Sequence, residues 1–119
     1  MTTLAFLDLT VTQGPNVGMR YSVPQNMFRI LSRYEVGFIA DERVLNPEQQ
    51  ELVLKYVPKK FQENKGPDIL LDDPVLSTAH ALVLFTEEKS IWVDFMNEKI
   101  QTLQIGDSIS IGNTTLKVS

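Results

Sequence analysis

His80 is the first residue to consider for catalysis, because imidazole is the usual general acid or base at neutral pH. It lies between apolar residues in a run typical of a central β-strand, and the chain contains no second histidine and no cysteine. The sequence also offers no glycine-rich phosphate loop and no convincing pair of nucleophile and base. We therefore interpret His80 as a buried, hydrogen-bonded structural residue, and expect no catalytic residue, no cofactor and no enzyme activity.

Three acidic residues, Asp68, Asp72 and Asp73, are close enough in sequence to suggest a site for a divalent cation. Their spacing does not match a calcium-binding loop, in which oxygen ligands recur at fixed alternate positions. Carboxylates beside a proline, such as Pro74, more often cap turns. We expect turn and capping roles for these residues, and no metal site.

A basic patch is predicted at Lys55, Lys59, Lys60 and Lys65, as either a solvated face or a docking site for an acidic partner. The net charge of −4 and the pI near 4.9 argue against binding to nucleic acid or to anionic lipid. No apolar run is long enough to span a membrane, and the first residues do not resemble a signal peptide. With no cysteine, a cytoplasmic location fits best.

Most of the chain reads as short strands separated by turns, which predicts an all-β antiparallel sandwich or barrel and a single domain, residues 1–119. We expect Tyr21 and Trp92 to be core residues rather than platforms for a ligand. The apolar run at 79–85 is typical of a strand buried on both faces. The expected strands are residues 3–12, 19–23, 27–31, 79–85, 91–95, 108–111 and 114–118, the last two joined by a turn at Gly112-Asn113.

The middle of the chain, residues 34–67, contains a different pattern. Asn46-Pro47 is a good helix start, and Pro58 should end the helix at Val57. Residues 52, 53, 56 and 57 form an apolar stripe at helical spacing. We predict one amphipathic helix at 47–57 that packs on the sandwich or on a partner. Because surface loops tolerate changes in length, we expect a sandwich lacking 34–67 to fold.

Four motifs in this order resemble the forkhead-associated (FHA) domain over nearly the whole chain except the helical middle. They are Gly14 and Gly18 around the first turn; Ile30-Leu31-Ser32-Arg33; Asp68 to Asp73 followed by Ser77-Thr78-Ala79-His80-Ala81; and Gly106-Asp107-Ser108-Ile109-Ser110-Ile111-Gly112. The resemblance implies an FHA/SMAD-like β-sandwich of about eleven strands whose loops at one end bind phosphothreonine. It thus implies an interaction module rather than an enzyme.

The resemblance also implies a role for particular residues. Arg33 and Ser77 would bind the phosphate, Thr78 would assist through its hydroxyl, and His80 would brace the loop that carries Ser77. An arginine fork, a hydroxyl and loop amides together suit a phosphate chemically. Asn97 would either hold the backbone of the bound peptide or correspond to a later residue in the next strand.

This chain departs from the family pattern in four places. Ser32 replaces the glycine before Arg33, and Thr78 stands where the family often has arginine. The Asn-Gly-Thr stretch expected after Asp94 is missing, and the helical insertion at about 34–67 is additional. This chain is therefore expected to be a divergent member.

Two functions remain open. The first is a signalling adaptor in the cytoplasm that binds a phosphothreonine-containing target of a Ser/Thr kinase through Arg33 and Ser77. The second is a degenerate domain that binds an unphosphorylated protein, through the inserted helix, as a scaffold or assembly component. In the second case Arg33 would be a surface residue paired with Glu35 or Asp72, and Ser77 would only cap its own turn.

Overall fold

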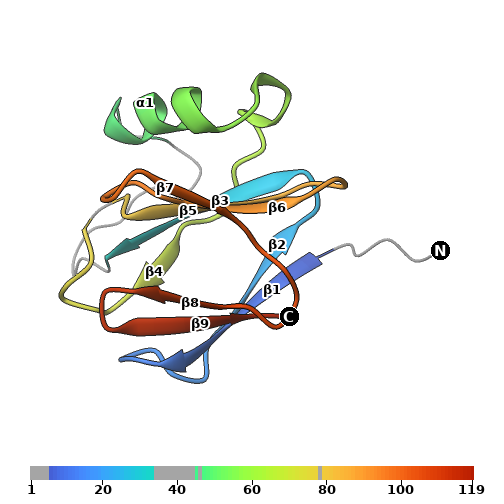
Figure 1. Ribbon diagram of the computed structural model, residues 1–119. Helices are drawn as coiled ribbons and strands as arrows, with labels where there is room; N and C mark the ends of the chain where they lie inside the picture. The colour runs from blue at the N-terminus through green and yellow to red at the C-terminus, as the bar shows by residue number, and fades with distance from the viewer. Residues whose placement is uncertain (1–5, 34–44, 46, 78) are drawn as a thin grey trace.

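The computed structural model describes residues 6–33, 45, 47–77 and 79–119. Within these ranges the chain forms nine strands, one α-helix and one 3-10 helix (Figure 1). In chain order they are β1 (Phe6–Gln13), β2 (Arg20–Pro24), β3 (Met27–Arg33), α1 (Pro47–Tyr56), η1 (Lys59–Phe61), β4 (Ile69–Leu71), β5 (Ala81–Phe85), β6 (Ser90–Asp94), β7 (Lys99–Thr102), β8 (Ser108–Ile111) and β9 (Thr114–Val118).

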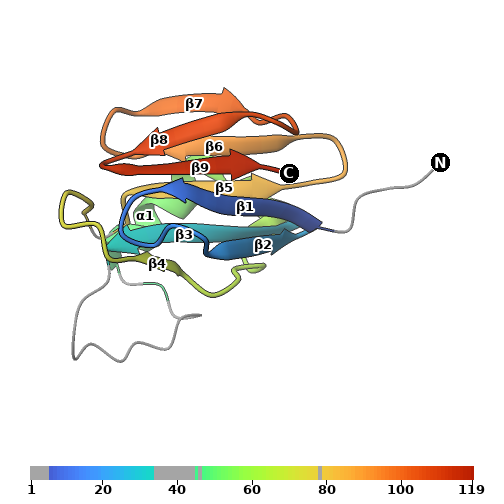
Figure 2. The ribbon, with the colours of Figure 1, turned by 90° about the horizontal axis from the view of Figure 1, so that it is seen from below.

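Two sheets stack into a sandwich, so the predicted all-β class is confirmed. One sheet has the strand order β2-β1-β9-β8, and the other has the order β4-β3-β5-β6-β7. In Figure 1 the five-stranded sheet lies between the four-stranded sheet and helix α1. Figure 2 shows the strands of both sheets running in similar directions, with β2 and β4 at one edge and β7 and β8 at the other.

One strand pair departs from the predicted antiparallel pattern, because β4 runs parallel to β3. The register pairs Leu31 with Ile69 and Arg33 with Leu71. Parallel neighbours need a long connection that carries the chain back to its starting end. Residues 34–67 provide that connection, and Lys65 forms an isolated parallel bridge with Phe28 on the way. The described residues also contain nine strands, fewer than the eleven or so that the resemblance implies.

The inner core lies between the two sheets and consists almost entirely of strand residues. The alternation in β1 places Leu7, Leu9 and Val11 on the inner face, as predicted, where each is almost fully buried. Trp92 is also buried in this cluster and Tyr21 packs against it, which confirms their predicted core role. This core follows from the two-residue period of strands, because alternate side chains point to the same face.

The outer core lies on the opposite face of the five-stranded sheet, beneath α1 (Figure 1). From the helix it contains Val53, together with Val57 just beyond the helix end. From the sheet it contains Phe28, Ile30, Leu82, Leu84 and Val93, all with 0% exposure. β5 is buried along its whole length, as predicted, because Leu82 and Leu84 enter the outer core while their alternate neighbours enter the inner core.

Helix α1 has almost the predicted bounds. It runs from Pro47 to Tyr56, and the Val57 amide still donates to the Val53 carbonyl at 2.9 Å. The expected cap, Asn46, lies outside the described residues. Leu54 points to solvent with 68% exposure, so the helix has one buried and one exposed face. The apolar stripe thus packs on the sandwich, one of the two outcomes predicted for it.

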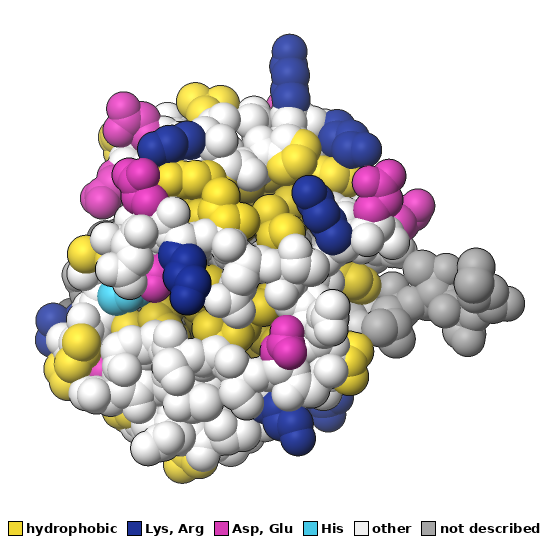
Figure 3. All heavy atoms as spheres, in the orientation of Figure 1, with side chains coloured by type: hydrophobic (Ala, Val, Ile, Leu, Met, Phe, Trp, Pro, Cys, Tyr) yellow, Lys and Arg dark blue, Asp and Glu magenta, His cyan; other side chains and the backbone are white. Residues whose placement is uncertain are grey.

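Apolar side chains also reach the surface near the outer core. Ile100 on edge strand β7 pairs with Val93, so both side chains lie on the same face of the sheet. Val93 is covered, whereas Ile100 is 55% exposed. In the orientation of Figure 1, apolar side chains gather below the helix (Figure 3). Neither described helix is long and apolar enough to cross a membrane.

Candidate functional site

Three segments meet at one end of the five-stranded sheet (left in Figure 2): the last residues of β3, the β4–β5 loop and the β6–β7 turn. Leu31 of β3 pairs with Ala81 at the start of β5, and Ala81 pairs with Asp94 at the end of β6. The strand register therefore gathers the three segments in which the sequence predicts phosphate-binding residues.

Arg33 ends β3 with an exposed side chain. Its backbone amide donates to the Ser77 carbonyl at 3.4 Å, which holds the strand end against the β4–β5 loop. Within the described residues Arg33 forms no ion pair, Asp72 included, and Glu35 lies outside them. The structure therefore brings Arg33 and Ser77 together and leaves the guanidinium open to solvent.

His80 supports the loop that carries Ser77. Its Nδ1 accepts the Ser77 backbone N–H at 3.0 Å, so Nδ1 carries no proton in this arrangement. The His80 backbone donates to the Leu31 carbonyl and accepts from the Phe95 amide. The residue thus connects β3, the Ser77 loop and the β6–β7 turn, as a bracing role requires. It is hydrogen-bonded as predicted but half-buried rather than buried, because it lies at the exposed end of the sheet.

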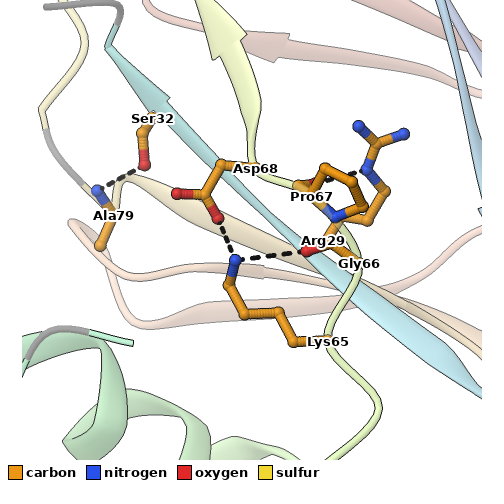
Figure 4. Close-up of polar contacts among 7 residues, drawn as sticks. All are labelled: Arg29, Ser32, Lys65, Gly66, Pro67, Asp68 and Ala79. Atoms are coloured by element: carbon orange, nitrogen blue, oxygen red, sulfur yellow. Dashed lines mark hydrogen bonds and ion pairs between the residues drawn. The ribbon is translucent and has the colours of Figure 1, made fainter. Parts of the chain in front are cut away.

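Ser32 supports the same loop from the other side. Its buried Oγ accepts the Ala79 backbone N–H at 3.0 Å (Figure 4). The amides of Ser77 and Ala79 are therefore both bonded to protein side chains. Two of the loop amides that were expected to bind a phosphate are therefore already used within the protein. Thr78, between them, lies outside the described residues.

Asp73 joins the start of this loop to the other sheet. Its carboxylate is fully buried and accepts hydrogen bonds from the Val75 amide (3.0 Å), the Asn113 amide (2.7 Å) and the Thr114 hydroxyl (2.9 Å). Burial by itself would raise the pKa of Asp73, but these three bonds, with a smaller contribution from His80, hold the pKa below its ordinary value.

Position 112, in the β8–β9 turn, must be glycine for the turn to lie this close to Asp73. Gly112 has φ +58°, and a Cβ there would lie 2.9 Å from Asp73 Oδ2 and 2.8 Å from Leu76 Cδ2. A larger residue would therefore push the carboxylate and the turn apart. Asp73 is thus the structural carboxylate that the sequence favoured over a metal ligand.

The other two acidic residues also have protein partners. Asp72 accepts from the Asn16 side-chain amide (3.2 Å), and its own backbone N–H donates to Asn16 Oδ1 (2.7 Å). Asp68 pairs with Lys65 Nζ at 2.6 Å (Figure 4). Across the described part of the chain, no group of three or more acidic, histidine or cysteine side chains could hold a metal ion.

Lys65 does not belong to an exposed basic patch, contrary to the sequence prediction. Its side chain is buried, and it donates to the Gly66 carbonyl as well as pairing with Asp68. Burial requires such partners, because an unpaired ammonium is costly to remove from water. Lys55, Lys59 and Lys60 are exposed, so only these three remain available at the surface.

Asn97 reaches the correct end of the sheet but is engaged within its own turn. Its side-chain amide donates to Asp94 Oδ2 at 3.2 Å. The other oxygen of Asp94 accepts the backbone amides of Met96 (2.9 Å) and Asn97 (3.3 Å). A short turn closed by an aspartate therefore follows β6, and Asn97 serves that turn.

Helix α1 contacts the same β6–β7 turn, which the sequence did not predict. The rings of Tyr56 and Phe95 lie 5.9 Å apart, and Lys55 Nζ lies 3.7 Å from a carboxylate oxygen of Glu98. The exposed ion pair contributes little by itself. The aromatic contact, however, ties the insertion to one of the three site-forming segments.

Ser32 is therefore the supporting residue whose role sequence reasoning missed, whereas for Asp73 the sequence predicted a turn and capping role but not the bonds to the β8–β9 turn. Ser32 carried a signal, because a polar residue replaced glycine at the end of an apolar strand.

A hollow of about 450 Å³ lies at the opposite end of the sheet, between the β5–β6 turn and η1. Its lining includes Lys60, Phe61 and Lys89, and none of the residues predicted to bind phosphate.

Comparison with known proteins finds similarity in structure only. No family model matches the sequence, and no curated protein matches it. The FHA domain of the CT664 protein from Chlamydia trachomatis matches with a TM-score of 0.58 at 16% identity, over 95% of each chain. The FHA domain of an Arabidopsis thaliana hypothetical protein matches with a TM-score of 0.64 at 16% identity, over 98% of this chain and 86% of the other.

A third structure comes from a structural and functional analysis of phosphothreonine-dependent FHA domain interactions. It matches with a TM-score of 0.57 at 15% identity, over 95% of this chain and 94% of the other. These matches span almost the whole chain, including both sheets. The chain therefore has the forkhead-associated fold, as the sequence motifs predicted.

Proposed function

We propose, on the premise of this fold, that the protein is an interaction module that binds a phosphothreonine-containing protein or peptide through Arg33 and Ser77. The contact between the Arg33 amide and the Ser77 carbonyl carries the proposal, because it joins the strand end that bears Arg33 to the loop that bears Ser77. One similar structure comes from work on phosphothreonine-dependent FHA domain interactions. The proposed role is binding rather than catalysis, because the sequence offers one histidine, no cysteine and no convincing pair of nucleophile and base.

The chemistry of the two side chains suits a phosphate. A guanidinium presents parallel N–H donors that match phosphate oxygens, and each charge-assisted bond contributes about 1.5–3 kcal/mol. The Ser77 hydroxyl adds a donor on a half-buried loop whose backbone is held by His80. Thr78 would add a second hydroxyl from the same loop.

The expected affinity is modest. The amides of Ser77 and Ala79 are occupied, and Asn97 is bonded to Asp94, so fewer donors remain for the peptide. We expect a dissociation constant weaker than about 1 μM, on the order of tens of micromolar. Higher salt should weaken the complex, because the guanidinium is exposed.

Calorimetric titration of a phosphothreonine peptide library, beside the unphosphorylated library, tests the proposal. Only the phosphorylated peptides should bind, and Arg33→Ala should weaken binding at least about tenfold, or about 1.4 kcal/mol. Arg33→Lys should recover little, because an ammonium cannot reproduce the fork. Arg20→Ala, at an exposed arginine of the four-stranded sheet, is the matched control and should bind normally.

A second candidate is an unphosphorylated partner, with the module as a scaffold or assembly component. The occupied amides and the engaged Asn97 favour it, because they remove contacts that a phosphopeptide would use. The inserted helix would then supply the docking surface. Equal binding of the two libraries, or a cellular partner retained by Arg33→Ala, would select this candidate and refute the phosphate site.

A further inference from the structure

Ser32 occupies an unusual position for a polar residue. It follows two fully buried residues near the end of β3 and is itself only 3% exposed. Its side chain lies on the outer face, the same face as that of Ile30, because alternate strand residues share a face. A hydroxyl buried there needs a hydrogen-bonding partner, and the Ala79 amide at 3.0 Å is that partner.

The residue that Ser32 binds has a constrained backbone. Ala79 has φ +54°, a left-handed conformation that residues other than glycine rarely adopt. Ala79 lies in the turn just before the start of β5. An otherwise disfavoured conformation persists only where the surroundings hold it, and the Ser32 hydroxyl is bonded directly to it.

Two side chains therefore hold the loop, and they bond to residues two positions apart, Ser77 and Ala79. His80 Nδ1 accepts the Ser77 amide, and Ser32 Oγ accepts the Ala79 amide. Arg33, the next residue after Ser32, binds the Ser77 carbonyl through its own amide. Ser32 and Arg33, which are adjacent at the strand end, therefore both bond to the loop, at Ala79 and at Ser77.

We propose that Ser32 is a positioning residue that sets the distance between the Arg33 guanidinium and the Ser77 hydroxyl for phosphate binding. A glycine in this place could not make the bond. The inference rests on the proposed function, since it assigns Ser32 a role in that same site. It goes beyond that function because Ser32 touches no ligand and acts only through the loop.

The test compares two substitutions that each remove one buried hydroxyl from a loop-holding bond. Ser32→Ala removes the acceptor for Ala79. Thr86→Val, at the opposite end of β5, removes the acceptor for the amides of Glu88 (3.3 Å) and Lys89 (3.1 Å). Ser32→Thr keeps the hydroxyl and serves as the rescue variant. Each protein is titrated with the phosphothreonine peptide that binds the wild type most tightly, at a temperature where its thermal melt shows it folded.

We expect Ser32→Ala to weaken binding roughly fivefold to tenfold, as losing about one hydrogen bond's contribution would. Thr86→Val should bind like wild type even if its melting temperature falls equally, and Ser32→Thr should restore most of the affinity. Hydrogen exchange should show the Ala79 amide protected in wild type and unprotected in Ser32→Ala.

The outcomes separate the two hypotheses. If the wild type binds no phosphopeptide, the proposed function fails and this role fails with it. If the wild type binds and Ser32→Ala binds equally well, the positioning role alone is wrong. Fast exchange of the Ala79 amide in the wild type would overturn it too, and this measurement remains decisive if Ser32→Ala does not fold.

Discussion

The inner and outer faces of the five-stranded sheet are both buried, but by different parts of the chain. The inner face meets the four-stranded sheet, and its cluster consists mainly of strand residues. The outer face meets α1 and the residues after it, all from the segment between Arg33 and β4. One cover therefore belongs to the sandwich itself, and the other is supplied by an insertion.

The difference explains why β5 is apolar along its whole length. In a sandwich with one solvated face, a strand alternates apolar and polar residues. Here Leu82 and Leu84 face outward and are fully buried because α1 covers them. Strand β5 and the insertion thus depend on each other. The outer face of β5 must be covered to be apolar, and the apolar stripe of α1 needs a surface on which to pack.

Replacing residues 34–67 by a short glycine-containing loop should have the largest effect. The sequence suggested that the sandwich would survive, but this deletion uncovers Phe28, Ile30, Leu82, Leu84 and Val93. Large apolar side chains contribute about 1.5–3 kcal/mol each when buried, so the loss is comparable to the roughly 5–15 kcal/mol that stabilise a domain. We expect aggregated or unfolded protein by size-exclusion chromatography and circular dichroism.

A pair of point substitutions controls for the altered chain length. Val53→Asp places a carboxylate in the outer core, whereas Leu54→Asp places it on the exposed side of the same helix. The first should destabilise strongly and the second should change stability by only about 0.5 kcal/mol. A cooperative melt near the wild-type temperature for both the deletion and Val53→Asp would show that the cover is dispensable.

Leucine truncations on the two faces compare the packing of the cores directly. Leu9→Ala opens a cavity in the inner core and Leu82→Ala opens one in the outer core, and both leucines are fully buried. Each should lower the free energy of unfolding by about 2–5 kcal/mol, measured by urea denaturation. A cost below about 1 kcal/mol for Leu82→Ala alone would mean that the helix packs loosely on the sheet.

Asp73→Asn should have a smaller effect on the free energy of unfolding, and this effect should depend on pH. Asp73 lies at the site end of the sandwich, where its carboxylate joins the β4–β5 loop to the β8–β9 turn. At neutral pH we expect a loss of about 1–3 kcal/mol, since an amide cannot accept all three bonds of the carboxylate. The folded-state pKa of Asp73 is lowered, so its stabilisation is present above the unfolded value near 3.8 and disappears as the pH falls through the lower folded value.

Urea denaturation of wild type and Asp73→Asn between pH 7 and pH 2 measures this effect. The difference in stability should be constant at neutral pH and shrink as the pH falls below about 4. Asp8→Asn is a useful comparison, because the pKa of Asp8 is lowered mainly by the Ser22 hydroxyl and by Arg20 on an exposed face. A difference for Asp73→Asn that does not change with pH would contradict the role of its charge.

The end of the sheet that carries the candidate site was predictable in part. The resemblance of the motifs around Arg33, Ser77 and His80 to the FHA domain implied that these residues lie together. The motif pattern did not show that Asn97 would bond to Asp94 or that Ser32 would bind Ala79. These bonds join residues through turn geometry and strand register, which a list of residue types does not contain.

The sequence by itself determined the all-β class, and it predicted the C-terminal hairpin and helix α1 almost to the residue, because these depend on local periodicity, turn residues and prolines. It did not predict the bounds of strands β4 and β7. Only the tertiary structure decided that β4 lies parallel to β3, that Lys65 is buried against Asp68, and that α1 covers the outer face. Each of these involves segments brought together by the long connection at 34–67. Local sequence preferences cannot specify such contacts, because their stability comes from apolar burial and paired charges between surfaces that meet only in the folded chain.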